Sequence, residues 1–190
     1  MTEIFVDGDR SSDVPYFAAA MARRPSGWLA TELDLDEVDD VTALSEALRE
    51  VDESADLTLL LLEEDDLYVA VVRVDSGEDS RIFVSDIRAG DESRIAEMLL
   101  EEAGLPVPVP LSVDDEIAEE PDVAVVRDDD AVAGTDVVPV GDYDLLADLG
   151  TPAATLLALC AHEGTLPADV ITAIAERAGC LDELEKIREG

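Results

Sequence analysis

The stretch that decides the fold is Leu57-Thr-Leu-Leu-Leu-Leu-Glu-Glu-Asp-Asp-Leu-Tyr-Val-Ala-Val-Val-Arg-Val74. Two apolar runs of strand length flank the acidic turn from Glu63 to Asp66, a pattern that predicts two neighbouring strands. A further apolar run, Arg81 to Ile87, follows the turn residues Asp75-Ser76-Gly77. Because short turns join consecutive strands, we expect a three-stranded antiparallel meander.

On the N-terminal side of the meander, the pattern predicts a β-hairpin. Its strands are the apolar stretch Tyr16 to Met21 and the alternating stretch Trp28 to Leu35, joined by the turn residues Arg23-Arg24-Pro25-Ser26-Gly27. Glu32 and Asp34 fall on the opposite face of the second strand from its leucines. One side of the sheet is therefore expected to face water, as antiparallel sheets allow.

Two helices are predicted to cover the sheet. Asp40 is a suitable N-cap for a helix whose apolar stripe runs from Val41 to Val51. Asp91 is the predicted cap of a second helix, which Gly104 ends. The resulting order, ββαβββα, places the chain in the α+β class, with an antiparallel sheet of about five strands.

Composition divides the chain into four segments. Residues 1–14 form a polar tail, and residues 15–104 form the α+β domain. Residues 105–140 combine prolines with acidic runs, which is typical of an extended linker, although Val123 to Arg127 has the pattern of an edge strand. Residues 141–190 carry start and stop signals for four short helices. We expect this helical module and the α+β domain to fold as separate units.

Charge is the most unusual property of the chain: 48 acidic residues against 12 basic residues give a formal net charge of −36. Nucleic acids and anionic membranes bind proteins through Lys and Arg, so neither is an expected partner. A negative field favours association with a basic protein, loose binding of divalent cations and solubility at high salt, and solubility alone is the competing explanation. Arg outnumbers Lys 11 to 1, a bias that a GC-rich genome or a salt-rich cytoplasm would each produce.

The two cysteines, Cys160 and Cys180, lie within apolar helical segments and do not resemble a secreted disulfide framework. The N-terminus lacks a positively charged region followed by a long apolar run, and no 18 apolar residues stand together. A cytoplasmic location is therefore expected.

The sequence shows no recognisable catalytic site. His162 is the only histidine, and Cys160, two positions away on a helix, points in a different direction, so the two cannot form a nucleophile–base pair locally. A zinc site needs closely spaced thiolates and imidazoles, which are missing. The run from Asp34 to Asp40 lacks the Gly and Glu of a calcium loop, and no phosphate-binding glycine loop occurs. No catalytic, metal-binding or cofactor-binding residue is expected, and no cofactor.

Two aromatic residues are candidates for a partner surface. Trp28 begins the second predicted strand, and Tyr68 lies on the fourth. Large aromatic side chains are enriched where proteins bind one another, so both suit an interface. Core packing is the competing interpretation for both.

Several segments resemble a known family. They are Pro15-Tyr-Phe-Ala-Ala-Ala-Met-Ala-Arg23, Gly27-Trp-Leu-Ala-Thr-Glu-Leu-Asp-Leu-Asp-Glu-Val38, Leu67-Tyr-Val-Ala-Val-Val-Arg-Val74, Arg81-Ile-Phe-Val-Ser-Asp86, Asp142-Tyr-Asp-Leu-Leu-Ala-Asp-Leu-Gly-Thr-Pro-Ala153 and Leu166-Pro-Ala-Asp-Val-Ile-Thr-Ala-Ile-Ala-Glu-Arg-Ala-Gly179. Together they resemble the tRNA adenosine deaminase-associated proteins of actinobacteria, over roughly residues 15–104 and 141–187. The resemblance implies a neighbour or partner enzyme and carries no catalytic residues with it.

The chain is not the deaminase itself. A zinc deaminase of this kind needs H-x-E and P-C-x-x-C. Here Glu163 directly follows His162, and no P-C-x-x-C occurs. The leading hypothesis is a non-enzymatic accessory protein that binds a basic surface on the deaminase or on a neighbouring enzyme. The alternative is an unrecognised metal-dependent enzyme that uses clustered carboxylates.

Overall fold

A computed structural model describes residues 16–103, 137–161 and 164–189. It contains a six-stranded sheet in which all neighbouring strands are antiparallel, in the order β2-β1-β3-β4-β5-β6. The strands are β1 (Tyr16–Arg24), β2 (Gly27–Glu32), β3 (Leu57–Glu64), β4 (Tyr68–Asp75), β5 (Arg81–Val84) and β6 (Val140–Gly141). The α+β class, the hairpin and the meander are confirmed.

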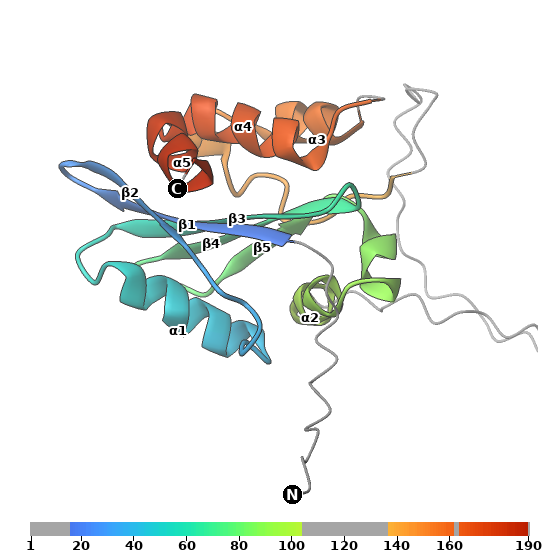
Figure 1. Ribbon diagram of the computed structural model, residues 1–190, viewed down its shortest axis with the longest axis horizontal. Helices are drawn as coiled ribbons and strands as arrows, with labels where there is room; N and C mark the ends of the chain where they lie inside the picture. Colours follow the sequence, from blue (N-terminus) through green and yellow to red (C-terminus); the bar gives the residue numbers. More distant parts are fainter. Residues whose placement is uncertain (1–15, 104–136, 162–163, 190) are drawn as a thin grey trace, which may run out of the picture.

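Helices cover both faces of this sheet, as Figure 1 shows. One face carries α1 (Val41–Val51) and α2 (Arg94–Glu102), with the 3₁₀ turn η1 (Ile87–Asp91) between β5 and α2. The other face carries the 3₁₀ turn η2 (Ala147–Leu149) and the helices α3 (Ala153–Ala161), α4 (Pro167–Ala178) and α5 (Leu181–Arg188). None of the helices in the described ranges is long and apolar enough to cross a membrane.

The two central strands explain this three-layer arrangement. Leu57 to Leu62 of β3 and Tyr68 to Val74 of β4 are buried at every position. Continuous apolar runs of this kind are typical of strands with both faces covered, whereas alternating strands have one face in water. The expectation of one wet face is therefore wrong: Trp28 and Ala30 of β2 pack towards the C-terminal helices.

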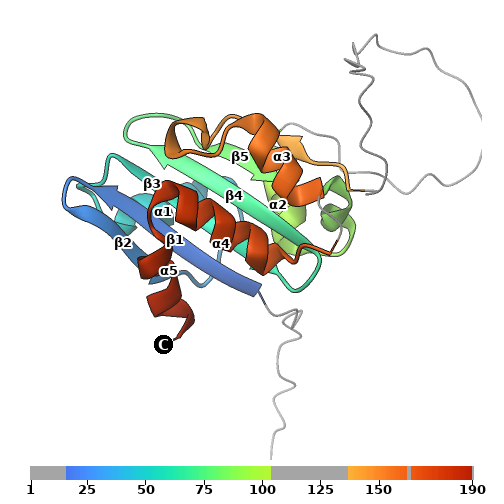
Figure 2. The same ribbon diagram turned by 90° about the horizontal axis from the view of Figure 1, so that it is seen from above.

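The C-terminal helices share a core with the sheet. The sheet contributes buried residues of the strands: Ala19, Met21, Leu57, Leu59, Leu61, Val69, Val71 and Phe83. The C-terminal part contributes buried residues of the helices and of the segment before η2: Leu145, Leu146, Leu149, Leu156, Val170, Ile171, Ile174, Ala175 and Leu184. Figure 2 shows α4 lying across the strands. That residues 15–104 and 141–190 fold as separate units stays a prediction, and the shared core weighs against it.

The sixth strand is absent from the sequence-based expectation. Val140 and Gly141 pair with Val84 and Phe83 at the β5 edge, so the end of the predicted linker belongs to the sheet. Just before it, the Ile87 backbone N–H donates to the Val138 carbonyl at 2.9 Å. The edge strand predicted at residues 123–127 lies outside the described residues, as does most of the 105–140 linker.

The helix caps agree only in part with the expectation. Asp40 caps α1, because its side chain accepts a hydrogen bond from the Ala43 backbone N–H at 2.7 Å. The predicted cap of α2, Asp91, instead ends η1, and Ser93 caps the helix by accepting from Ala96 N–H at 3.1 Å. The 3₁₀ turn, which runs through Asp91, displaces the start of the helix.

Ser93→Ala is expected to lower the free energy of unfolding by about 1–2 kcal/mol. The change removes the α2 cap, and it also removes the hydroxyl that donates to the buried Glu64 carboxylate. Urea unfolding monitored by circular dichroism measures the effect. Ser93→Thr, which keeps the hydroxyl, should recover most of the loss, and equal losses in the two variants would contradict the assigned role.

Candidate protein-interaction site

The two aromatic residues predicted to face a partner lie in different surroundings. Tyr68 is 1% exposed, and its hydroxyl donates to Glu64 at 2.8 Å within the core beneath α2. The structure therefore corrects the expectation that Tyr68 faces a partner, and core packing describes it. Trp28 is half-buried against the core on the α5 side, and its part in binding stays a prediction.

The thiols of the two cysteines are unreactive at neutral pH. Cys160 and Cys180 are free thiols, and burial raises the pKa of each to about 12. At neutral pH both therefore stay protonated, and a protonated thiol is a poor nucleophile and metal ligand. His162 lies outside the described residues.

Carboxylates of the Asp34 to Asp40 run have structural partners. Asp34 accepts from the Asp36 backbone N–H at 2.9 Å, and the Tyr16 hydroxyl lies 3.2 Å from a carboxylate oxygen of each. Asp40 is the α1 cap. Across the described ranges, no three His, Cys, Asp or Glu side chains are arranged to hold a metal ion.

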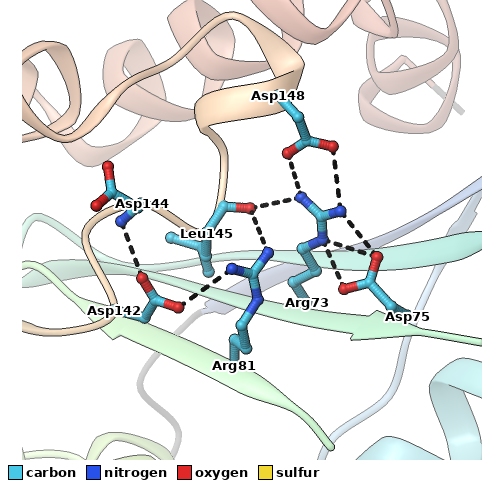
Figure 3. Close-up of polar contacts among 7 residues, drawn as sticks. All are labelled: Arg73, Asp75, Arg81, Asp142, Asp144, Leu145 and Asp148. Carbon is cyan, nitrogen blue, oxygen red and sulfur yellow. Dashed lines mark hydrogen bonds and ion pairs between the residues drawn. The ribbon is translucent and has the colours of Figure 1, made fainter. Parts of the chain in front are cut away.

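Two arginines join the sheet to the segment before α3, as Figure 3 shows. Arg73 of β4 and Arg81 of β5 are directly opposite each other in the strand register. Arg73 donates to Asp75 on its own strand, to the Leu145 carbonyl at 2.8 Å and to Asp148. Two positive charges directly opposite each other in a sheet repel and destabilise it. The carboxylate and carbonyl acceptors around Arg73 and Arg81 offset this repulsion.

The environment of Arg73 keeps it charged and fixed in place. Burial alone would lower the pKa of this guanidinium, but its hydrogen bonds to Asp75 and Asp148 outweigh burial and raise it. The hydrogen bond from Arg73 also lowers the pKa of Asp148. Arg81 makes longer contacts, 3.3 Å to Asp142 and 3.4 Å to the Leu145 carbonyl. The network is a structural connection between layers, and the buried arginine is committed to it.

A second polar region forms a groove in the part of the chain that the structure describes. It is a groove of about 310 Å³, here called the acidic groove, between the start of β1, the β3–β4 turn and the start of α4. It is lined by Tyr16, Phe17, Glu63, Asp65, Asp66, Leu166 and Ala168. A larger pocket of about 520 Å³ beside the β5–β6 edge is lined by Glu102 and Asp142 together with Arg81. Among the residues that the structure describes, those that line the acidic groove include carboxylates and no basic residue.

Exposed leucines flank the acidic groove. Leu166, which is 49% exposed, lines it, and Leu67, 40% exposed, follows Asp66 in the β3–β4 turn. In that turn Asp65 has φ of +46°, a conformation that side-chain-bearing residues rarely adopt. The turn thus presents carboxylates and an exposed apolar side chain together.

Two of the residues that line the acidic groove, Phe17 and Glu63, also contact an arginine. Arg188 of α5 lies over the Phe17 ring, 5.0 Å from its centre, and donates to Glu63 at 2.8 Å and to Thr172 at 3.1 Å. Burial raises the pKa of Glu63, Arg188 lowers it, and the nearby charge of Asp169 raises it again. The net shift is upward, so burial and the charge of Asp169 together outweigh the effect of Arg188.

The sequence contains part of this site. The acidic turn from Glu63 to Asp66 is evident there, but Leu166 is about one hundred residues further along the chain. No periodicity connects the two, because their proximity depends on α4 packing on the face predicted to be wet. Phe17 carries no signal beyond that of an ordinary strand residue.

Comparison with known proteins places the chain in a family. The family model of the Rv3753c-like tRNA adenosine deaminase-associated proteins matches residues 16–181, which span β1 to the start of α5. No curated protein and no solved structure matched. The family's description is that of a protein associated with the deaminase, not of a deaminase. The chain belongs to the Rv3753c-like tRNA adenosine deaminase-associated protein family.

Proposed function

We infer that the protein is a non-enzymatic accessory factor that binds a tRNA adenosine deaminase through the acidic groove. The observation that carries this inference is the combination of carboxylates and an exposed leucine, Leu166, in one open groove. The family's description, which names a tRNA adenosine deaminase, supports this choice of partner. A cytoplasmic location, where such an enzyme meets tRNA, follows from the proposal.

The charge of the chain supports a basic partner. A net charge of −36 raises the rate of encounter with a positive surface and discourages direct contact with tRNA. An acidic accessory protein would thus approach the enzyme rather than its substrate. Basic surfaces that recognise tRNA backbone are complementary to a protein of this charge.

The chemistry of the described side chains supports a binding role. Cys180 is buried and Cys160 is half-buried, and both thiols are protonated at neutral pH. The buried Arg73 is fully engaged by Asp75, Asp148 and the Leu145 carbonyl. Among the residues that line the acidic groove, no nucleophile is paired with a base. The carboxylates there are suited to accepting hydrogen bonds from cations.

Binding to the purified deaminase should weaken with salt. Isothermal titration calorimetry is expected to show the affinity falling at least about tenfold between about 50 and 300 mM NaCl, because surface charges are screened over a Debye length. Bovine serum albumin, itself acidic, is the control ligand and should not bind. Absence of binding at micromolar concentrations in low salt would refute the proposed function.

A further inference from the structure

One edge of the sheet is open for pairing with another strand. β2 is the last strand on its side of the sheet, and it pairs with β1 in a continuous register without a bulge. All of its residues are exposed or half-buried. A regular edge strand presents a row of unpaired backbone groups, which is a template for pairing with another chain.

The backbone of alternate residues of β2 points away from β1. Just beyond the paired strands, the Leu33 N–H donates to the Ala18 carbonyl at 2.9 Å. Because residues of an antiparallel pair alternate between facing the neighbouring strand and facing away, Trp28, Ala30 and Glu32 direct their N–H and C=O groups out of the sheet. Within the described part of the chain, no backbone hydrogen bond from a turn or loop reaches these groups. They are left for water or for another strand.

The opposite edge of the sheet is protected in the ways that natural edge strands usually are. β6 has only 2 residues, Pro139 precedes it and the charged Asp142 follows it. Short length, proline and charge all discourage pairing at an edge. β2 contains no proline, no lysine and no bulge, and its single charged residue, Glu32, lies at its end. Of these two edges, β2 is therefore the one suited to pairing.

A second copy of the same strand is complementary to this edge. When two β2 strands run antiparallel with the Ala30 residues opposite each other, Trp28 of each copy lies opposite Glu32 of the other. These outward-facing residues then exchange about six backbone hydrogen bonds across the boundary. No carboxylate of β2 lies opposite another in this register, whereas a parallel pairing would bring the two acidic ends together.

Charge also favours the antiparallel orientation. Arg23 is exposed, lies opposite Trp28 in the β1–β2 register, and forms no ion pair with the residues that the structure describes. Across the boundary, Trp28 is followed on the same face by Glu32 of the second copy, whose Cα atom is about 10 Å from that of Arg23. Both side chains are long enough to approach each other over the indole ring. Two-fold symmetry repeats this contact.

We propose that the protein forms a symmetric dimer in which the two β2 strands pair antiparallel and join the sheets of both copies. No residue of β2 lines the acidic groove, so this interface goes beyond the proposed function and leaves the groove open. Trp28, the aromatic residue expected at a partner surface, lies between the two charges of each contact. The net charge of −36 on each copy opposes association, but repulsion between exposed charges is screened beyond about 8 Å at physiological salt.

Sedimentation velocity of the full-length protein at about 300 mM NaCl, where this repulsion is screened, tests the dimer. The dimer fraction should rise with protein concentration. Ala30→Pro should weaken the dimer at least about tenfold, because proline removes an outward N–H without removing a hydrogen bond to β1. Circular dichroism and thermal unfolding check that this variant folds. A monomer at concentrations up to about 100 µM, or an undiminished dimer in folded Ala30→Pro, would overturn the proposal.

Charge reversal tests the pairing with substitutions at exposed residues. Arg23→Glu should weaken the dimer at least about threefold, and adding Glu32→Arg should restore it, because opposite charges face each other again. Arg23→Glu combined with Glu50→Arg is the matched control: Glu50 is exposed on α1, so the net charge is the same but the contact is not restored. Recovery by both second substitutions alike, or no loss in Arg23→Glu, would overturn the assigned pairing. These variants also decide the question if Ala30→Pro does not fold.

Discussion

Arg73→Met is expected to lower the free energy of unfolding by about 3 kcal/mol, because it removes the cation from a buried network and leaves its acceptors unpaired. The Arg73 side chain is 8% exposed and holds Asp75, Asp148 and the Leu145 carbonyl together. Methionine fills similar space without the charge, so the loss reports the hydrogen bonds and ion pairs rather than a cavity. Urea unfolding with a fluorescence readout measures it.

Arg81→Met is the matched control for this change. Arg81 lies directly opposite Arg73 but is 36% exposed and makes contacts of 3.3 and 3.4 Å. Its loss should cost about 1 kcal/mol or less, as is usual for an exposed pair. Equal destabilisation by the two variants would show that Arg73 has no special role in joining the C-terminal helices to the sheet.

The Arg73 effect should also depend on pH. Arg73 lowers the pKa of Asp148 through a hydrogen bond, so this part of the stabilisation is complete above the ordinary aspartate pKa. It is lost as pH falls through the lowered value, when Asp148 becomes protonated in the folded state. The stability difference between wild type and Arg73→Met should therefore shrink below about pH 4. A constant difference down to about pH 2 would contradict the assignment.

Gly141→Ala is expected to cost about 3 kcal/mol, through backbone strain and a steric clash. Gly141 has φ of +104°, and a Cβ at this position would lie 2.1 Å from the Ile82 carbonyl oxygen. Since the clash is with backbone rather than with a flexible side chain, β6 must leave the sheet edge to relieve it. Thermal unfolding and the exchange rate of the Asp142 amide, which donates to Ile82 at 2.8 Å, measure the two consequences.

Gly77→Ala separates strain from clash. Gly77 also has positive φ, +80°, but no atom lies within 4 Å of the position that a Cβ would take there. This variant should cost only about 1 kcal/mol, which is the effect of the backbone conformation alone. If both glycine variants lose the same stability, close packing of β6 against β5 is not what requires Gly141.

The fold class follows from local patterns, and the layer arrangement does not. Strand periodicity and turn residues around Leu57 to Val74 predict the meander correctly, because they depend on neighbours in sequence. The continuous apolar run in β3 also indicates that both faces of this strand are buried. The alternating pattern of β2 suggests instead that one face of the sheet is in water. This inference fails because β2 is an edge strand, and a charged residue such as Glu32 is tolerated there.

Long-range partners limit what the sequence can say about the site. Arg73 within an apolar strand is a signal of a buried ion network, yet Asp148, its partner, is separated from it by 75 residues. The sequence leaves Tyr68 open between a partner surface and the core, because it shows the type of side chain and not the packing of α2 above it. The acidic groove requires α4 and α5 to be placed on the sheet before Phe17, Glu63 and Leu166 can be seen together.

Amide hydrogen exchange of the full-length protein, alone and mixed with the tRNA adenosine deaminase in low salt, tests the central claim most directly. Exchange reports which backbone amides a partner covers or stabilises. We expect added protection at Asp65 to Leu67 and at Leu166 to Asp169, with none on α1. Protection centred on α1, or an unchanged exchange pattern at saturating deaminase, would contradict it.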